Sequence, residues 1–272
     1  MTSYQPISQI YLYDEPDAAG LDVDEIGGFI ASQFPSVEVQ PRADFVTHQF
    51  RRFTPQQRTE LEREMLKQFE RAQVKDLEVI VGGGSVGTYK SEDLGLVFDA
   101  AAYQAILRLL TEETEAGPDH LHVVFTENLI GSWREEKTLF QLQPICLGDP
   151  AIVSTTGLVE ALAKPREYEY RRAQLAMLGM DTEALEDLAE DFASCTLGYG
   201  DPRLNEVCKG YALMACMHRM FGEAFCDDPG CRLFNARTQP EMMAAQCGPK
   251  AGLCERHQEM LEGVTGPKED QE

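Results

Sequence analysis

Two pairs of residues with the chemistry of zinc ligands lie in the C-terminal third of the sequence. Cys226 and Cys231 flank the turn sequence Asp-Asp-Pro-Gly, and Cys254 is followed three positions later by His257. Zn²⁺ favours thiolate and imidazole ligands, and a tight turn lets two of them bind the ion from one side. Four protein ligands leave no open position for a catalytic water. We therefore predict a structural zinc site made of these four residues.

The distribution of the cysteines also indicates metal binding. The chain contains eight cysteines, and four of them fall between residues 226 and 254. The cytosol keeps thiols reduced, so we expect no disulfides and interpret the clustering as a metal site. Cys247 is the competing fourth ligand, since an all-cysteine site would leave His257 free. The alternative to zinc is a group of thiols buried in an apolar core.

Three other histidines occur in patterns that zinc hydrolases also use. His120 and His122 lie two positions apart in an apolar stretch, so they point to the same face of an expected strand. Because no third ligand is in view, we interpret them as histidines on a solvated strand face and keep metal binding as the alternative. His218 lies on the apolar stripe of an expected helix, without the second histidine that the His-Glu-x-x-His pattern requires. We therefore assign no catalytic residue and keep a non-standard hydrolase site built on His218 as the alternative.

Two further motifs are better explained by structure than by chemistry. The run Gly82–Gly87 fits the G-x-G-x-x-G pattern of dinucleotide-binding turns, but polar residues follow where the packing helix should begin. We interpret this run as a surface loop and expect no nucleotide cofactor. Ser154 precedes an expected helix, and a hydroxyl residue in that position is usually an N-cap.

The charge balance restricts the partners of the protein. The 46 acidic and 24 basic residues give a net charge of −22, whereas nucleic acids and anionic membranes require a cationic surface. We expect neither of these partners. Acidic excess with sixteen arginines but eight lysines is typical of a halophilic protein, because concentrated salt screens the repulsion between like charges. The alternative is an ordinary acidic mesophilic protein.

The N-terminal residues do not resemble a secretory signal, and no apolar run approaches the roughly 20 residues that span a membrane. We therefore expect a soluble, cytoplasmic protein. Its oligomeric state stays open.

Hydrophobic periodicity predicts strands and helices that alternate in the first half of the chain, with helices dominating the second. The expected strands cover residues 10–13, 37–39, 77–81, 121–125 and 139–146. The expected helices cover residues 21–34, 54–74, 99–110, 156–163, 166–178, 182–192 and 202–221. The prediction is an α/β (α+β) fold with a mixed sheet. Residues 1–150 form a mixed α/β part, residues 151–262 form a helical part held by zinc, and residues 263–272 form a disordered tail.

The expected helix before Gly222, the Cys-x4-Cys pair and the late Cys-x2-His pair together resemble the C-terminal part of the archaemetzincins. In that family the helix carries His-Glu-x-x-His-x-x-Gly-x-x-His, and a Cys-x4-Cys pair with a distal Cys-x2-Cys pair holds a second zinc. The resemblance covers residues 203–261 and implies a metzincin-like fold. It also implies a structural zinc on the four residues named above, with His257 in place of the family's last cysteine.

The catalytic residues of that family are all replaced in this chain. The resemblance places the three zinc-binding histidines at Ala215, Arg219 and Phe225, and the glutamate at Cys216. It therefore implies a metallopeptidase relative that has kept the structural zinc and lost the catalytic one. We expect an inactive protein that binds a peptide or a protein in the ancestral cleft.

Longer stretches of the chain are similar to an uncharacterised family of archaeal proteins described as metallopeptidases. The similar stretches are Ser154–Glu160, Lys164–Tyr168, Tyr199–Leu204, Phe225–Ala236 and Leu253–His257. This resemblance extends over most of the sequence, and it implies the same class of zinc protein.

Overall fold

The computed structural model describes residues 4–74, 77–81, 85–89, 96–134, 139–179 and 182–265. The strands are β1 (Gln9–Tyr13), β2 (Glu38–Arg42), β3 (Leu77–Val81), β4 (Ser85–Tyr89), β5 (Val97–Asp99), β6 (His120–Thr126), β7 (Leu129–Trp133), β8 (Phe140–Gln143), β9 (Ile145–Cys146) and β10 (Ala151–Ser154). The helices are α1 (Val23–Gln33), α2 (Phe45–Phe50), α3 (Pro55–Ala72), α5 (Ala100–Leu110), α6 (Thr155–Glu160), α7 (Arg166–Met177), α8 (Thr182–Phe192), α9 (Leu204–Phe221), α10 (Gln239–Cys247) and α11 (Glu255–Thr265).

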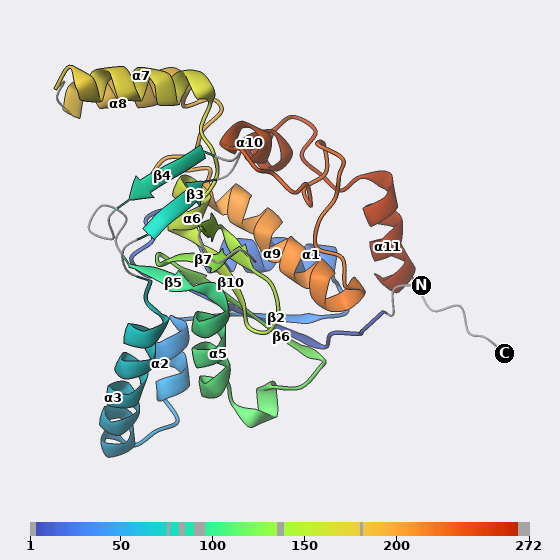
Figure 1. Ribbon diagram of the computed structural model, residues 1–272. Coiled ribbons are helices and arrows are strands. Elements are labelled where there is room, and N and C mark those ends of the chain that lie inside the picture. The colour runs from blue at the N-terminus through green and yellow to red at the C-terminus, as the bar shows by residue number, and fades with distance from the viewer. Residues whose placement is uncertain are drawn as a thin grey trace.

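The strands form two five-stranded sheets (Figure 1), one in the order β2-β1-β6-β10-β9 and the other in the order β4-β3-β8-β7-β5. In the first sheet β2, β1, β6 and β10 are parallel, and β9 pairs antiparallel at the edge. The predicted mixed α/β class is confirmed, with two mixed sheets where one was expected. The expected strand 139–146 divides at Pro144, because proline has no N–H to donate to a ladder, and the chain crosses there from β8 in one sheet to β9 in the other.

Helices cover both faces of the first sheet. Ile10 and Leu12 of β1 belong to the apolar core beneath α1 and α9, whereas Tyr11 and Tyr13 face α2, α3 and α5 on the opposite side. This alternation follows from the two-residue period of a strand. Figure 1 shows α1 beside α9 in the middle of the view, and α2, α3 and α5 together at the lower left. Among the described residues, no helix has both the length and the apolar composition needed to cross a membrane.

Helix α9 is the element that positions the C-terminal part of the chain. Most of its residues are buried, and it packs against α1, α10 and the first sheet. Gly210 allows the close approach of α10, since a Cβ atom there would collide with the side chain of Gln246. The helix ends at Gly222, whose φ of +71° is a left-handed conformation that glycine adopts without strain. The chain then turns directly into the segment that carries Cys226.

Two expectations about irregular segments need correction. Helix α11 continues to Thr265 because Leu261 and Val264 pack against the core, so the predicted disordered tail is wrong for residues 263–265. Residues 266–272 lie outside the described residues.

Ser85–Tyr89 forms β4, antiparallel to β3, although the expectation for this part of the glycine-rich run was a surface loop. A dinucleotide-binding turn would need a helix at this position. Residues 82–84 of that run lie outside the described part of the chain. The division of the chain at residue 150 stays a prediction.

The face of the first sheet beneath α2 contains a polar network. Arg42 donates two hydrogen bonds to the carboxylate of Glu115, at 2.8 and 2.7 Å, and one to the Tyr13 hydroxyl at 2.9 Å. Its guanidinium carbon lies 3.7 Å from the centre of the Tyr11 ring, a cation–π contact. The Tyr13 hydroxyl also lies 3.0 Å from Nδ1 of His122. The network therefore joins β1, β2 and β6, and its hydrogen bond from Arg42 lowers the pKa of Glu115.

Replacing Glu115 with glutamine should lower the free energy of unfolding by about 2 kcal/mol at pH 7, a typical contribution of a hydrogen bond to a charged group. The pKa of Glu115 is lower in the folded protein than in the unfolded chain. Its contribution is therefore complete above the unfolded value of about 4.3 and disappears as the pH falls through the folded value. Urea unfolding at several pH values between 7 and 3 measures this difference.

Glu112→Gln is the matched control, because the Glu112 carboxylate is half exposed and lies 3.9 Å from Arg52. Exposed ion pairs of this kind contribute about 0.5 kcal/mol. Equal losses of stability in the two variants, or a loss in Glu115→Gln that stays constant down to pH 3, would contradict the role of the network.

Candidate functional site

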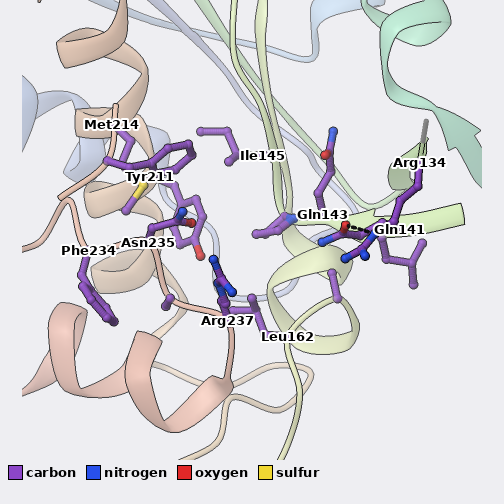
Figure 2. Close-up of a pocket in the computed structure, with 15 residues that line it drawn as sticks. Arg134, Gln141, Gln143, Ile145, Leu162, Tyr211, Met214, Phe234, Asn235 and Arg237 are labelled. Carbon is purple, nitrogen blue, oxygen red and sulfur yellow. Dashed lines mark hydrogen bonds between the residues drawn. The ribbon is translucent and has the colours of Figure 1, made fainter. Parts of the chain in front are cut away.

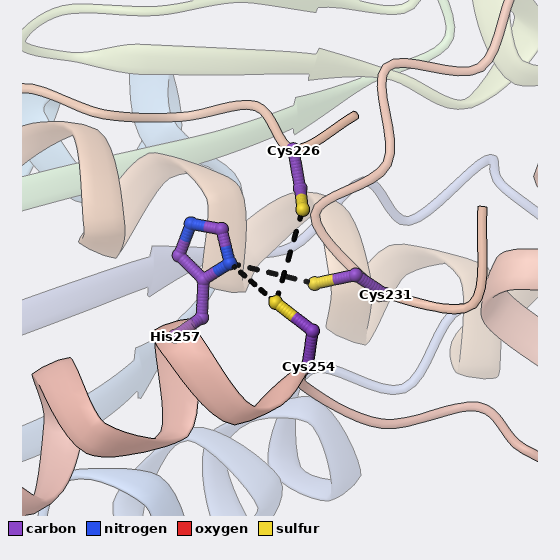
Figure 3. A group of neighbouring side chains, drawn as sticks. All are labelled: Cys226, Cys231, Cys254 and His257. Atoms are coloured by element: carbon purple, nitrogen blue, oxygen red, sulfur yellow. Dashed lines mark hydrogen bonds between the residues drawn. The ribbon is translucent and has the colours of Figure 1, made fainter. Parts of the chain in front are cut away.

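The structure brings the four predicted zinc ligands together (Figure 3). The ligand atoms of Cys226, Cys231, Cys254 and His257 all lie within 4.8 Å of one another. Among the described residues, these four are the one group of three or more histidine, cysteine or acidic side chains that is close enough to hold a metal ion. The group therefore combines two ligand pairs from separate segments. Binding of zinc by these four residues stays a prediction.

The spacing of the ligand atoms fits a tetrahedral zinc ion. Two sulfurs that each lie about 2.3 Å from a tetrahedral zinc are about 3.8 Å apart. The Sγ atoms of Cys226 and Cys254 are separated by 3.8 Å, and Sγ of Cys231 lies 3.7 Å from Nδ1 of His257. The Sγ atom of Cys254 is nearer to that nitrogen, at 3.1 Å. None of these cysteines is in a disulfide.

The first ligand pair is shaped by the Asp-Pro-Gly turn. The Gly230 N–H donates to the Asp228 carboxylate at 2.9 Å, and the Cys231 N–H donates to the Asp228 carbonyl at 3.0 Å. Backbone N–H groups also point at both sulfurs: that of Asp228 lies 3.3 Å from Cys226 Sγ, and that of Leu233 lies 3.5 Å from Cys231 Sγ. Such donors favour the thiolate form that a metal requires.

The second ligand pair belongs to the start of α11. Cys254 immediately precedes the helix and His257 lies in its first turn, so the two side chains are neighbours on one face. The Arg232 N–H donates to the Gly252 carbonyl at 2.7 Å, which holds the two ligand segments side by side.

The protonation of these side chains determines what a metal must displace. Burial raises the pKa of the Cys226 thiol, and it raises that of Cys231 to about 12. Burial lowers the pKa of His257, so its imidazole is neutral at pH 7. Zinc binding would therefore release thiol protons. Nε2 of His257 is buried without a hydrogen-bond partner among the described residues, so the ring is positioned by the contacts of Nδ1 with the sulfurs.

The competing fourth ligand is not part of this group. Cys247 lies at the end of α10, half-buried, and does not belong to the cluster. Cys208 and Cys216 are fully buried within α9, and Cys226 and Cys231 belong to the same apolar core.

His120, His122 and His218 do not meet at a common point. His122 is fully buried, with Nδ1 against the Tyr13 hydroxyl and Nε2 2.9 Å from the Glu115 carbonyl, so the expectation of a solvated strand face is wrong for this residue. His120 lies 3.1 Å from the Tyr11 hydroxyl. His218 lines a separate cavity of about 400 Å³ near the end of α9. Within the described part of the chain, these imidazoles form no group that could hold a metal.

Ser154 is the N-cap of α6, as the sequence indicated. Its Oγ accepts a hydrogen bond from the Gly157 N–H at 2.8 Å and donates one to the Asn128 carbonyl at 2.7 Å. Both contacts are with backbone atoms, and no base is in contact with the hydroxyl among the described residues. The residue therefore has a structural role.

The positions that the archaemetzincin resemblance assigned to catalytic ligands do not share a pocket. Ala215 and Cys216 are 2% and 0% exposed. Arg219 lines the cavity that contains His218, whereas Phe225 lines a different one. These side chains offer no set of metal ligands in any common space.

A cleft of about 560 Å³ lies between α9, the strands β8 and β9, and the segment that precedes α10 (Figure 2). It is lined by Arg134, Gln141, Leu142, Gln143, Pro144, Ile145, Ala161, Leu162, Tyr211, Met214, Phe225, Phe234, Asn235, Ala236 and Arg237. None of these described residues is a histidine, cysteine, aspartate or glutamate. Sequence reasoning missed this cleft, because its walls come from segments far apart in the chain and no motif links them.

Cys231→Ser should remove the bound zinc and lower the melting temperature by about 10 °C. The reason is that zinc at a thousand times its Kd stabilises the folded state by about 4 kcal/mol, and 1 kcal/mol corresponds to about 2–4 °C in a chain of this size. Elemental analysis and calorimetry on protein purified without metal affinity measure both effects. Hydrogen exchange should rise mainly in residues 203–261.

Cys247→Ser is the matched control and should retain one zinc per chain with a nearly unchanged melting temperature. Loss of zinc in Cys247→Ser together with its retention in Cys231→Ser would overturn the ligand assignment.

Comparison with known proteins places the chain in a family. No curated protein matches it. The crystal structure of an archaemetzincin from Methanopyrus kandleri, at 1.5 Å resolution, is 15% identical in sequence and has a TM-score of 0.48, with 95% of each chain covered. The model of the Probable metallopeptidase family (DUF6775) matches residues 6–264. Because this match extends over nearly the whole sequence, the chain belongs to that family.

Proposed function

We propose that this protein is a catalytically silent relative of metallopeptidases that binds a peptide or a protein segment in the cleft beside α9, with its C-terminal part held by one structural zinc. The observation that carries the proposal is the composition of the cleft, whose fifteen described lining residues include no metal ligand and no general base. A zinc peptidase needs three protein ligands for the catalytic ion, and a base to activate its water.

The lining of the cleft suits a peptide. Its apolar surface comes from aromatic and aliphatic side chains, and its polar surface comes from amides that pair with peptide groups. The aromatic and aliphatic side chains include Tyr211, Met214, Phe225 and Phe234, and the amide side chains are those of Gln141, Gln143 and Asn235. Ile145 belongs to β9, the edge strand of the first sheet. An extended peptide can pack along such an edge, so both the chemistry and the topology support this ligand class.

The zinc site supports the proposal because it lies at the base of one cleft wall. The Cys226 N–H donates to the Leu233 carbonyl at 2.7 Å, and the Asn235 N–H donates to the Cys226 carbonyl at 3.2 Å. Residues 234–237 form the wall that faces β8 and β9. A zinc ion on Cys226 and Cys231 would therefore hold this wall in place. Such an ion would preorganise the binding site without taking part in catalysis.

Ala236→Trp should fill the cleft and abolish peptide binding without loss of zinc. The probe is a pool of random dodecapeptides, with retained peptides identified and counted by mass spectrometry. We expect the unmodified protein to retain a subset of the pool intact, and Ala236→Trp to retain less than a tenth of it. Ala189→Trp, on the exposed surface of α8, is the control and should retain peptides normally.

Equal retention by all three proteins would contradict binding in this cleft. Cleavage of the peptides that disappears in His218→Ala would favour the alternative, a zinc hydrolase with a non-standard site in the cavity that His218 lines.

We also propose that the protein works in the cytoplasm of a halophilic archaeon, which the net charge of −22 supports. Screening lengths fall from about 10 Å at 0.1 M salt to about 3 Å at 1 M. The melting temperature should therefore rise as KCl increases from 0.1 to 3 M, and calorimetry measures it. Sucrose at matched osmolality does not screen charge and should give a smaller rise, whereas an equal rise in both solutes would contradict the proposal.

A further inference from the structure

The cleft differs in charge from the rest of the molecule. The chain carries 46 acidic residues and a net charge of −22, yet the described lining of the cleft contains two arginines and no carboxylate. In a protein with this composition, fifteen residues chosen without regard to charge would include two or three acidic ones. The described lining of the cleft is therefore positively charged in a negative protein, and such a surface attracts anionic ligands.

Arg237 contributes a guanidinium that makes no hydrogen bond or ion pair with any described residue. The nearby carboxylate of Glu241 is engaged by the backbone, since it accepts from the N–H groups of Arg237 and Thr238 at 2.8 and 3.0 Å. The contact with Thr238 belongs to the capping box of α10, so this carboxylate oxygen of Glu241 is engaged at the helix start. The exposed Arg237 side chain keeps its five N–H donors for a ligand.

Arg134 contributes a second guanidinium from the opposite wall. Its Nε donates to the amide oxygen of Gln141 at 3.1 Å, which orients the group and leaves both Nη atoms without a partner among the described residues. Figure 2 shows Arg134 with Gln141 and Gln143 on one side of the cleft, and Arg237 with Asn235 on the other. The two cations therefore flank a band of amide side chains that can pair with a peptide backbone.

We propose that the cleft selects acidic peptides, with Arg134 and Arg237 binding their carboxylates; this inference rests on the proposed peptide-binding function. A planar guanidinium matches a carboxylate with two parallel hydrogen bonds, and that geometry discriminates against the neutral amide of the same shape. The aromatic and amide surfaces between the two arginines suit a peptide. The negative charge of the whole protein opposes approach of a nucleic acid.

Two matched peptide pools test this selectivity. Both pools are dodecapeptides with the same randomised apolar positions; one has glutamate and the other glutamine at two fixed positions. We expect the unmodified protein to bind the glutamate pool at least tenfold more tightly, measured by fluorescence anisotropy in 0.2 M KCl. Arg134→Gln and Arg237→Gln should each reduce this preference, and the double variant should abolish it while still binding the glutamine pool.

Arg172→Gln is the control, because Arg172 is exposed on α7, a helix that contributes no residue to the described lining of the cleft. It should leave the preference unchanged, and all variants should keep their zinc content and melting temperature. Equal binding of both pools, or a preference that survives in the double variant, would overturn the carboxylate inference and leave peptide binding intact. Failure to bind either pool would instead overturn the proposed function together with the inference.

Discussion

The convergence of Cys226, Cys231, Cys254 and His257 is the constraint on which the C-terminal third of the molecule depends. Between α9 and α10 the chain runs through residues 222–238 without regular structure, apart from isolated bridges. A loop of this length inside a compact domain needs an anchor to hold one conformation. Two ligand pairs on either side of α10 supply such an anchor when they share an ion, because metal binding and folding are then coupled.

This constraint links the scaffold to the cleft. The segment that begins at Cys226 passes through Arg232, whose carbonyl accepts from Gln246 of α10 at 2.7 Å and whose guanidinium pairs with Glu206 of α9. It then forms the wall that ends at Arg237. In the proposed function, the zinc ion has a purely structural role. The helix face where the family resemblance expects catalytic ligands instead buries Ala215 and Cys216 against the core.

Most helices and strands were predicted from local sequence patterns. The arrangement of the strands into sheets was not, because it depends on pairing between distant segments. The helix after Thr54 begins with the expected N-cap and Pro55, because capping is decided within four residues. The proximity of the three cysteines and the histidine was predictable for a similar reason, since each pair is close in sequence and its chemistry is specific. The six-residue helix α2 is too short for its period to stand out. The break at Pro144 assigns β8 and β9 to different sheets, which depends on partners that periodicity does not reveal.

The cleft and the burial of His122 also depend on contacts between residues far apart in the sequence, which sequence patterns do not reveal. His122 has its partner in Tyr13, 109 positions earlier in the chain, and the alternation of a strand does not say which face will be covered. The cleft joins Arg134, Tyr211 and Arg237, which come from three segments far apart in the sequence, so their proximity follows only from the tertiary fold. Functional residues without a short motif are therefore found from the fold and not from spacing.

The most direct test of the account is zinc X-ray absorption spectroscopy, combined with elemental analysis, on protein purified in high salt without metal affinity. We predict one zinc per chain, coordinated by three sulfurs at about 2.3 Å and one nitrogen at about 2.0 Å. A second zinc, or a coordination shell that contains oxygen and an open position, would contradict the claim that this protein keeps only a structural ion.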